Sequence, residues 1–323
     1  MKKILTAFCA IFLLTGIVMA SDLIIESKNQ NYVEADKKIK FDGDVKVTVD
    51  DMKVVGDSAD VNVTDKQQLD TATFYDKPYA FEIKKNKKRE VKANILKVSL
   101  INKIIRAEGD TQSVVFDGKT PIVVINANTQ EYNTKTGVMT ANGAVTMLYK
   151  DIETFSNDAE ITTDKNGDLK KLVLIGNARV KQTNNETLAD KFVYDATTGN
   201  LTAYGNTTSN AIMDDGAKLT LKSNYQEYNQ KRSIFNASGN VRIWYQDYYA
   251  AGPKVTLYPG AGTTKPNEAY FIGRSSITQG VRTIYADKIK MIMKPKSFDA
   301  QGNTRTVIKN IGSGSDDNMT LGL

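Results

Sequence analysis

Apolar and polar residues alternate along nearly the whole chain after the first twenty positions. In one stretch Phe41, Gly43, Val45, Val47 and Val49 occupy every second position, with charged or polar residues between them. A period of two is typical of a β-strand with one buried face. Turn-forming pairs such as an Asn-Gly step at 166–167 separate the alternating stretches, as in β-hairpins. The pattern predicts an all-β, antiparallel fold with about eighteen strands.

A glycine motif repeats through these stretches. Each copy has a glycine in mid-strand, with apolar or small residues two positions before and after it. The glycines are Gly43, Gly109, Gly143, Gly176, Gly205, Gly239, Gly273 and Gly302, and Asp76 occupies the position of one further copy. Their spacing clusters near 33 residues, or twice that value across Asp76. A period of this size is the signature of a repeat architecture.

A second motif precedes each glycine by 15, 19 or 20 residues. It consists of an Asp or Asn followed by apolar residues at alternate positions. The copies are Asp57, Asn94, Asn128, Asn157, Asp190, Asn224 and Asp287, and Lys28 and Pro253 stand in two degenerate copies. The two motifs together define nine two-strand units over residues 24–309.

A glycine with apolar neighbours on both sides indicates a bend inside a continuing strand. An Asp or Asn of the partner strand is placed to bond the backbone at that bend. One bend per strand folds the ladder into two facing sheets, with the apolar side chains between them. The alternative is that the two motifs mark ordinary turns of a β-sandwich.

The first twenty residues predict a signal peptide. Lys2 and Lys3 precede an apolar run that ends Val18-Met19-Ala20, which suits cleavage before Ser21. The alternative is a retained membrane anchor, although an apolar run of 17 residues is at the short limit for a span. At the other end, residues 311–323 lack the alternation and are expected to form a flexible tail after a repeat domain over residues 21–310.

The composition argues against an enzyme. The chain has no histidine, and its single cysteine, Cys9, lies inside the predicted signal peptide. The mature chain would therefore lack the usual general base, thiolate metal ligands and disulfides. We expect no catalytic residues, no metal site and no cofactor. The net charge of +6 falls to +4 without Lys2 and Lys3, a mild basic bias that permits an anionic partner without indicating nucleic acid.

The two motifs resemble those of the OstA-like family of lipopolysaccharide transport proteins, which includes LptA. The segments that carry the resemblance are Leu188–Asp195, with its Ala-Asp step, and Leu201–Asn206, with its Ala-x-Gly-Asn ending. The resemblance implies a V-shaped β-jellyroll, open at both ends, that shields lipopolysaccharide acyl chains in the periplasm between the inner and outer membranes. It also implies end-to-end β-strand pairing with inner-membrane and outer-membrane OstA-like partners, or with further copies of the chain. The chain is about twice as long as typical bridge proteins of this family, so another envelope lipid is an open alternative.

Side chains an even number of positions from a motif residue lie on the same face of their strand. We predict that these side chains face inward and line a lipid groove. These residues are Phe41, Val45, Val47, Leu96, Val98, Ile105, Val145, Met147, Ile161, Leu174, Phe192, Tyr194, Val241, Ile243, Ile289 and Met291. The same set could instead fill a closed core. In that case the chain would be a structural or adhesive envelope protein.

Three further interpretations stay open at this stage. The basic run over residues 84–89 could meet lipid phosphates at a groove mouth, although lysine-rich hairpin tips are ordinary. An outer-membrane barrel is disfavoured because aromatic residues make up 8% of the chain and its last residue is not aromatic. A parallel β-helix enzyme is disfavoured by the frequent hairpin signals.

Overall fold

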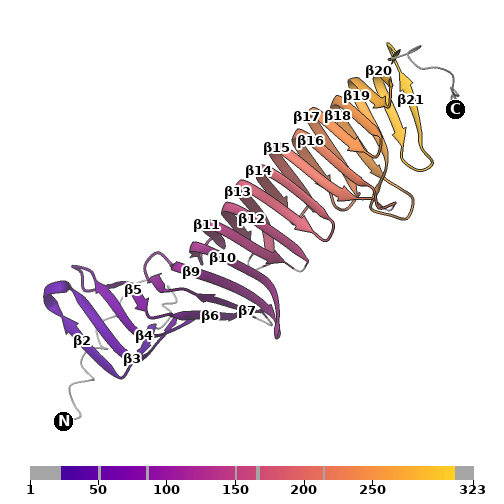
Figure 1. The fold of residues 1–323 in the computed structure, drawn as a ribbon. Coiled ribbons are helices and arrows are strands. Elements are labelled where there is room, and N and C mark those ends of the chain that lie inside the picture. Colours follow the sequence, from indigo (N-terminus) through magenta and orange to yellow (C-terminus); the bar gives the residue numbers. More distant parts are fainter. Residues whose placement is uncertain are drawn as a thin grey trace, which may run out of the picture.

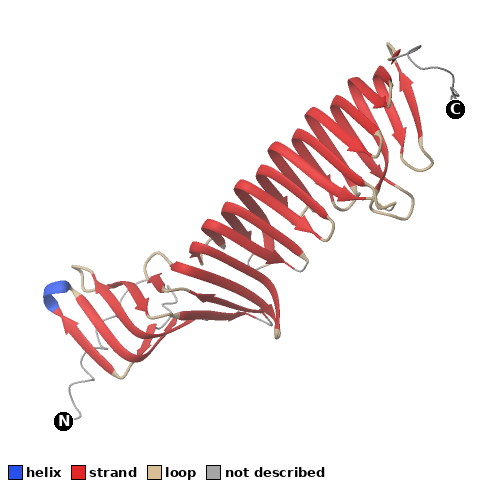
Figure 2. Ribbon diagram, in the orientation of Figure 1, coloured by secondary structure: helices blue, strands red, loops and turns tan. Residues whose placement is uncertain are grey.

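The computed structural model describes residues 23–49, 52–84, 87–149, 151–164, 168–213 and 215–309. The predicted signal peptide with Cys9 and the predicted tail at 311–323 lie outside these residues. The described part is built from β-strands and one short 3-10 turn at Glu34–Asp36 (Figure 2). No helix in this part is both long and apolar enough to cross a membrane.

The strands follow one another in a long ladder (Figure 1). They are β1 (Leu23–Glu26), β2 (Asn29–Val33), β3 (Lys38–Val49), β4 (Met52–Val63), β5 (Leu69–Tyr75), β6 (Tyr79–Lys84), β7 (Lys87–Lys92), β8 (Ile95–Ser99), β9 (Ile104–Asp117), β10 (Thr120–Asn133) and β11 (Val138–Tyr149). The second half holds β12 (Ile152–Thr163), β13 (Leu169–Gln182), β14 (Asn185–Asp195), β15 (Asn200–Ile212), β16 (Lys218–Asn229), β17 (Ile234–Tyr245), β18 (Tyr248–Pro259), β19 (Pro266–Gln279), β20 (Arg282–Ile292), β21 (Ser297–Gln301) and β22 (Arg305–Ile308).

All the strand pairings are antiparallel, and from β9 to β20 each strand pairs with the next one in sequence. Four pairs of short strands behave as single interrupted strands. β1 and β2 both pair with β3, β5 and β6 both pair with β4, β7 and β8 both pair with β9, and β21 and β22 both pair with β20. Counting each such pair as one gives eighteen strands, so the all-β, repeat-built antiparallel jellyroll predicted from the sequence is confirmed.

Each long strand bends at its motif glycine. The eight motif glycines have φ between +72° and +90°. Seven of them lie inside continuing strands, where the ladder register shifts beside the bend, for example between Asn142 and Val145, and Gly302 lies in the gap between β21 and β22. The residue after the glycine also has a positive φ in seven of the eight copies, as at Ala144 (φ 50°). Two successive residues in this left-handed conformation turn the strand sharply without ending it. The prediction of bends inside continuing strands is therefore correct.

The Asp or Asn motif residue packs against the glycine of the following strand. A Cβ added at Gly143 would meet Asn128, and one added at Gly176 would meet Asn157. Lys28 and Pro253 stand in the same place against Gly43 and Gly273. In two copies the motif side chain accepts a side-chain hydrogen bond across the bend instead of bonding the backbone, as between Asn303 Nδ2 and Asp287 Oδ2 at 2.7 Å. The backbone N–H groups of Lys28, Asn94 and Asp287 donate to the carbonyl oxygens of the motif glycines.

The interior consists of three apolar clusters in succession along the ladder. The first spans Phe41 to Ala107, the second Ile125 to Ala203 and the third Met213 to Met293. The second contains both Ala141, which precedes the bend at Gly143, and Met147, which follows it. The two halves of a bent strand therefore bury their apolar faces against one another, as a folded-over ladder requires.

The two ends of the ladder differ from its middle. Within the described residues, β1 and β2 pair on one side only, with β3, and β21 and β22 pair on one side only, with β20. These ends lie at opposite extremes of the elongated molecule (Figure 1). Both ends therefore present a strand edge that another strand could join.

Candidate functional site

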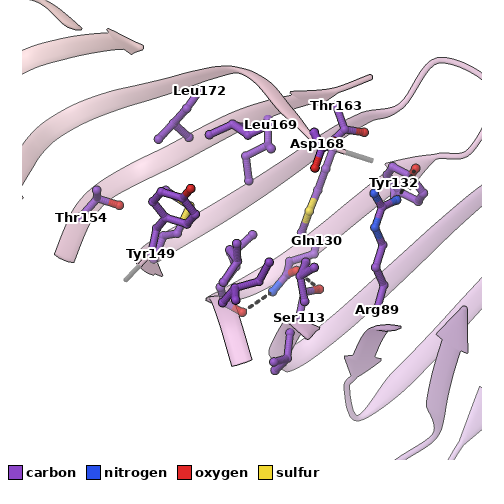
Figure 3. A pocket seen from close by; sticks show the side chains of 18 of the residues that line it. Arg89, Ser113, Gln130, Tyr132, Tyr149, Thr154, Thr163, Asp168, Leu169 and Leu172 are labelled. Atoms are coloured by element: carbon purple, nitrogen blue, oxygen red, sulfur yellow. Dashed lines mark hydrogen bonds between the residues drawn. The ribbon is translucent and has the colours of Figure 1, made fainter. Parts of the chain in front are cut away.

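A large cavity lies between the facing halves of the bent strands. Its volume is about 630 Å³, and its walls come from strands between β4 and β16 and from the turns beside them. Most of the lining side chains are aliphatic or aromatic, and they include Ile105, Ile125, Met139, Met147, Ile161, Leu172, Leu174, Val180, Phe192 and Leu201. Figure 3 shows part of the lining. A cavity of this size with mostly apolar walls is typical of a site for a small apolar or amphiphilic molecule.

A buried polar layer lies at β9–β10, in the wall of the cavity. Gln130 is 3% exposed, and its Nε2 donates to the carbonyl oxygens of Thr111 (3.3 Å) and Ile125 (3.2 Å). Its Oε1 accepts a hydrogen bond from the Ser113 hydroxyl at 2.5 Å, as drawn in Figure 3. Thr111 donates its own hydroxyl to the carbonyl of Ala127 (2.7 Å). The layer is internally bonded and separates the first apolar cluster from the second.

A matching layer lies at β15–β16. Gln226 is 2% exposed and accepts from the Ser209 hydroxyl at 2.5 Å, and the Thr207 hydroxyl donates to the carbonyl of Ser223 at 2.8 Å. Thr207, Ser209 and Gln226 each stand 96 positions after their counterparts in the first layer. This layer separates the second apolar cluster from the third. The cavity extends past the first layer to β4, β6 and β7, and at its other end it reaches the second layer, beside which Tyr228 lines it.

Charged and phenolic side chains line one side of the cavity. The Lys87 ammonium, next to the β6–β7 turn, is ion-paired with the Asp168 carboxylate at the start of β13. Arg89 of β7 donates to the Tyr132 hydroxyl at 3.3 Å and lies 3.8 Å from a carboxylate oxygen of Glu82. All five side chains line the cavity. The basic run at residues 84–89 therefore places two of its cations, Lys87 and Arg89, at the cavity.

Two further residues of the β6–β7 hairpin, Lys88 and Glu90, have shifted pKa values. The pKa of Lys88 is raised, foremost because its ammonium donates to the Glu90 carboxylate. Burial acts to raise the pKa of Glu90, but hydrogen bonds from Lys88 and Tyr79 outweigh it, and the net shift is downward. Both groups are therefore charged at neutral pH.

Two hydroxyls inside the walls have no partner. Thr154 is 3% exposed and Ser156 is 7% exposed, and no protein group in the described part of the chain lies within hydrogen-bond distance of either hydroxyl oxygen. Thr154 lines the cavity, and Figure 3 shows it beside Tyr149, away from Arg89 and Tyr132. An unsatisfied buried hydroxyl costs on the order of 1–3 kcal/mol. Both hydroxyl oxygens are shielded from the cavity, so this cost is carried by the wall itself.

The predicted inward-facing residues divide into two groups. All sixteen are buried or partly buried, which agrees with the parity argument. Six of them line the cavity, namely Ile105, Met147, Ile161, Leu174, Phe192 and Tyr194. The other ten do not line it, namely Phe41, Val45, Val47, Leu96, Val98, Val145, Val241, Ile243, Ile289 and Met291. Most of these ten pack in the first and third clusters, and Val98 lines a smaller hollow of about 160 Å³ beside Val49 and Ile104.

The sequence interpretation missed the polar layers. The segments Gly109–Ser113 and Gly205–Ser209 share a Gly-Asp/Asn-Thr-x-Ser pattern, and residues 128–133 and 224–229 share Asn-x-Gln-Glu-Tyr-Asn. These pairs are a visible signal, because polar residues recur at inward positions where other units carry aliphatic ones. The prediction of inward residues considered apolar side chains only, so it did not include these polar residues.

The site offers no grouping of metal-binding side chains. Within the described ranges there is no cluster of three or more His, Cys, Asp or Glu residues suited to a metal ion. What the arrangement provides is apolar surface, two internally bonded polar layers, unpaired hydroxyls and a few charges at one side. These features suit the binding of an amphiphile.

Part of the chain matches a known protein family. Residues 24–120 match the family described as LptA/(LptD N-terminal domain) LPS transport protein. Among solved structures, the chain is similar to a crystal structure of LptH from Pseudomonas aeruginosa, described as the LptA homologous periplasmic component of the conserved lipopolysaccharide transport device. That similarity has 10% sequence identity and a TM-score of 0.36, and it covers 40% of this chain and 95% of the LptH chain. No curated protein matches the sequence significantly. Residues 24–120 are thus similar to the LptA/LptD N-terminal family, and this match confirms the OstA-like resemblance predicted from the sequence.

Proposed function

We propose that this protein binds the acyl chains of lipopolysaccharide in its central cavity and shields them from water during transport from the inner to the outer membrane. The observation that carries the proposal is the mostly apolar cavity of about 630 Å³ inside the folded ladder. The family match of residues 24–120 supports the same cargo, since that family is named for lipopolysaccharide transport.

The cavity supplies binding free energy without specific chemistry. Burying one methylene group contributes about 0.8 kcal/mol, so ten methylenes contribute on the order of 8 kcal/mol before the entropic costs of binding. The charged groups that line the cavity are the cations Lys87 and Arg89, each ion-paired with a carboxylate, and the carboxylates Glu82, Glu90, Glu131, Asp151 and Asp168. The match of the site to acyl chains therefore rests on its apolar walls.

The proposal places the protein in the periplasm. The predicted signal peptide supports export, and the open strand edges at the two ends support end-to-end pairing with OstA-like partners of the inner and outer membranes or with further copies of the chain. Pairing at both ends would align successive interiors along one axis.

A structural envelope protein is the second candidate, because the first and third clusters are tightly packed. Phe74, Leu96 and Val61 are 0% exposed in the first cluster, and Phe271 and Ile289 are 1% exposed in the third. None of the third cluster's residues lines the cavity. On this second reading the central cavity would have no ligand.

The test is the lipid content of the exported protein. Purification without detergent, followed by lipid extraction and mass spectrometry, should recover lipopolysaccharide. Leu201→Trp fills the cavity and should lower the recovered lipid several-fold. Phe235→Trp is the control, because Phe235 also stands four residues before a motif glycine but lies outside the cavity. Lipid-free protein, or equal loss in both variants, would contradict the proposal.

A further inference from the structure

Charge is distributed unevenly along the ladder. Residues 216–309 contain fifteen Lys and Arg residues against five Asp and Glu residues, a net charge of +10. Residues 21–215 contain 26 Lys and Arg residues against 30 Asp and Glu residues, a net charge of −4. The basic segment comprises strands β16 to β22, at the C-terminal end of the elongated molecule (Figure 1). An excess of one sign on one part of a protein favours a partner of the opposite charge.

Part of this positive charge forms a row along the bends of the strands. Each of the five consecutive strands from β16 to β20 has one exposed cation within three residues of its motif residue, namely Lys222, Arg242, Lys254, Arg274 and Lys288. We call these five residues the basic ridge. Adjacent strands are about 4.8 Å apart, so the ridge extends over about 19 Å. None of the five residues lines the cavity, because the bends form the outer edge of the folded ladder.

The bends of earlier strands differ from the ridge in their charge. Within three residues of the motif residues, strands β16 to β20 carry no exposed Asp or Glu. Within the same distance, the earlier strands do carry exposed acids, namely Asp42, Asp44, Asp57, Asp110, Glu160 and Asp190. Asp44 is ion-paired with Lys28 at 2.8 Å. The bend edge therefore changes from mixed charge to uniformly positive charge at β16.

The fold itself does not neutralise the ridge. None of its five cations forms an ion pair with an acid of the described residues, and Lys222 lies over the Trp244 ring, 5.9 Å from its centre. Lys222 and Arg242 are direct cross-strand neighbours. Like charges at directly opposed positions destabilise a sheet. An external anionic partner would remove this repulsion.

Cations at the opposite edge, where the turns lie, are engaged within the protein. The Lys231 ammonium, in the turn between β16 and β17, donates to the Thr197 carbonyl at 3.0 Å. The Lys296 ammonium, in the turn after β20, donates to the Gln246 side chain and lies over the Tyr248 ring. The bend edge therefore offers the less engaged of the two groups of cations.

An exposed aliphatic side chain lies within the ridge. Ile272 is 49% exposed, and it pairs directly with Lys254 on one side and Lys288 on the other. Arg274 follows two residues later on the same strand. A soluble polyanion has no use for an exposed isoleucine, whereas a membrane surface offers phosphates to the cations and an apolar boundary to the isoleucine. The ridge is an outer edge without a cavity, which suits an extended surface better than a small molecule.

We propose that the basic ridge docks the C-terminal third of the protein on the surface of an anionic phospholipid membrane. The five cations contact lipid phosphates, and Ile272 inserts at the level of the headgroups. This inference goes beyond the proposed function, because the ridge lies outside the cavity and acts whether or not the cavity holds a lipid.

The test is co-sedimentation of the full-length exported protein with lipid vesicles. One set of vesicles contains equal parts of phosphatidylcholine and phosphatidylglycerol, and the other contains phosphatidylcholine alone. The protein should bind the anionic vesicles only, and high salt should release it. Each cation held near an anionic membrane strengthens binding by about fivefold, so the triple variant Lys254→Gln, Arg274→Gln, Lys288→Gln should bind on the order of 100-fold more weakly.

A second triple variant serves as the matched control. Lys231→Gln, Arg232→Gln, Lys294→Gln removes the same charge from exposed turns in the same third of the chain. These turns lie about 20 Å from the bends along the strands, which exceeds the screening length of about 10 Å in 0.1 M salt. The control should therefore lose much less binding than the ridge variant.

A single variant tests the apolar part of the ridge. Ile272→Ser leaves every charge in place and should weaken binding to the anionic vesicles by about three- to tenfold, because the isoleucine no longer buries apolar surface at the headgroups. Unchanged vesicle binding by this variant would overturn the membrane contact and favour a soluble polyanion as the partner of the ridge.

The vesicle measurements separate this inference from the proposed function. Equal losses in the two triple variants would overturn the ridge as the docking surface, since net charge alone would then explain binding. Equal binding to both kinds of vesicle, or to neither, would also overturn it. These outcomes leave acyl-chain binding in the cavity untouched, because lipid recovered from the purified protein measures that binding separately.

Discussion

Asn128 lies directly against Gly143, so that a Cβ added to the glycine would come within 2.5 Å of the asparagine Nδ2. The two residues stand on adjacent strands, β10 and β11, at the same bend. Gly143 combines this close approach with a φ of +80°, which L-amino acids avoid. Both constraints recur along the ladder, and they explain why one glycine and one Asp or Asn mark each unit.

Replacement of Gly143 by alanine should destabilise the fold. We expect a loss of about 1–2 kcal/mol from the left-handed conformation and a further 1–3 kcal/mol from the contact with Asn128. The control is Gly262→Ala, since Gly262 has a φ of +71° with no atom within 4 Å of the added Cβ. Urea denaturation of both variants measures the difference. Equal losses would contradict the role of the asparagine contact, whereas Asn128→Ala in the Gly143→Ala background should restore part of the stability.

The polar layers should behave as coupled units. Gln130→Leu leaves the Ser113 hydroxyl and the carbonyls of Thr111 and Ile125 without their partner, and should cost about 1–3 kcal/mol. Adding Ser113→Ala should cost little more, because the serine has already lost its acceptor. A double-mutant cycle of the free energy of unfolding measures this coupling. Strictly additive losses would show that Ser113 and Gln130 do not stabilise each other.

Alkaline pH should reveal the environment of Tyr245. Burial, together with the hydrogen bond from its hydroxyl to Asp215 Oδ2 (2.8 Å), raises its pKa from 10.0 to about 12. The folded state thus keeps this proton where the unfolded chain loses it. The resulting stabilisation is complete below pH 10 and is lost as the pH rises to about 12.

Tyr245→Phe isolates this effect. The difference in absorbance at the tyrosinate band between the unaltered protein and the variant should titrate near pH 12. The alkaline decline in stability should also be shallower in the variant. A difference titration centred near pH 10 would contradict the buried, hydrogen-bonded environment.

The sequence predicted the ladder well because its determinants are local. A period of two defines the strands, and a glycine at a regular position defines each bend, so neither depends on distant residues. The interruption between β5 and β6 was not predicted, because Asp76 was counted as a regular copy of the glycine motif.

The cavity could not be predicted in the same way. Phe192 and Val241 both stand two residues from a motif residue and both face inward, yet Phe192 lines the cavity and Val241 packs in the third cluster. Parity determines the face of a strand that a side chain occupies. Whether an inward side chain is tightly packed or lines a cavity depends on how side chains from many strands fill the space between the facing halves of the bent strands. The residue at a single position does not determine this.

The most direct test of acyl-chain binding is site-specific photo-crosslinking in cells that make lipopolysaccharide. A photoreactive residue at Phe192 should label lipopolysaccharide. One at Lys191, which is exposed on the opposite face of the same strand, should not, and one at Val241 in the closed third cluster should label far less than Phe192. Labelling at Phe192 alone is the predicted result. No labelling at Phe192, or equal labelling at Phe192 and Lys191, would contradict a lipid-binding cavity and favour a structural role for the chain.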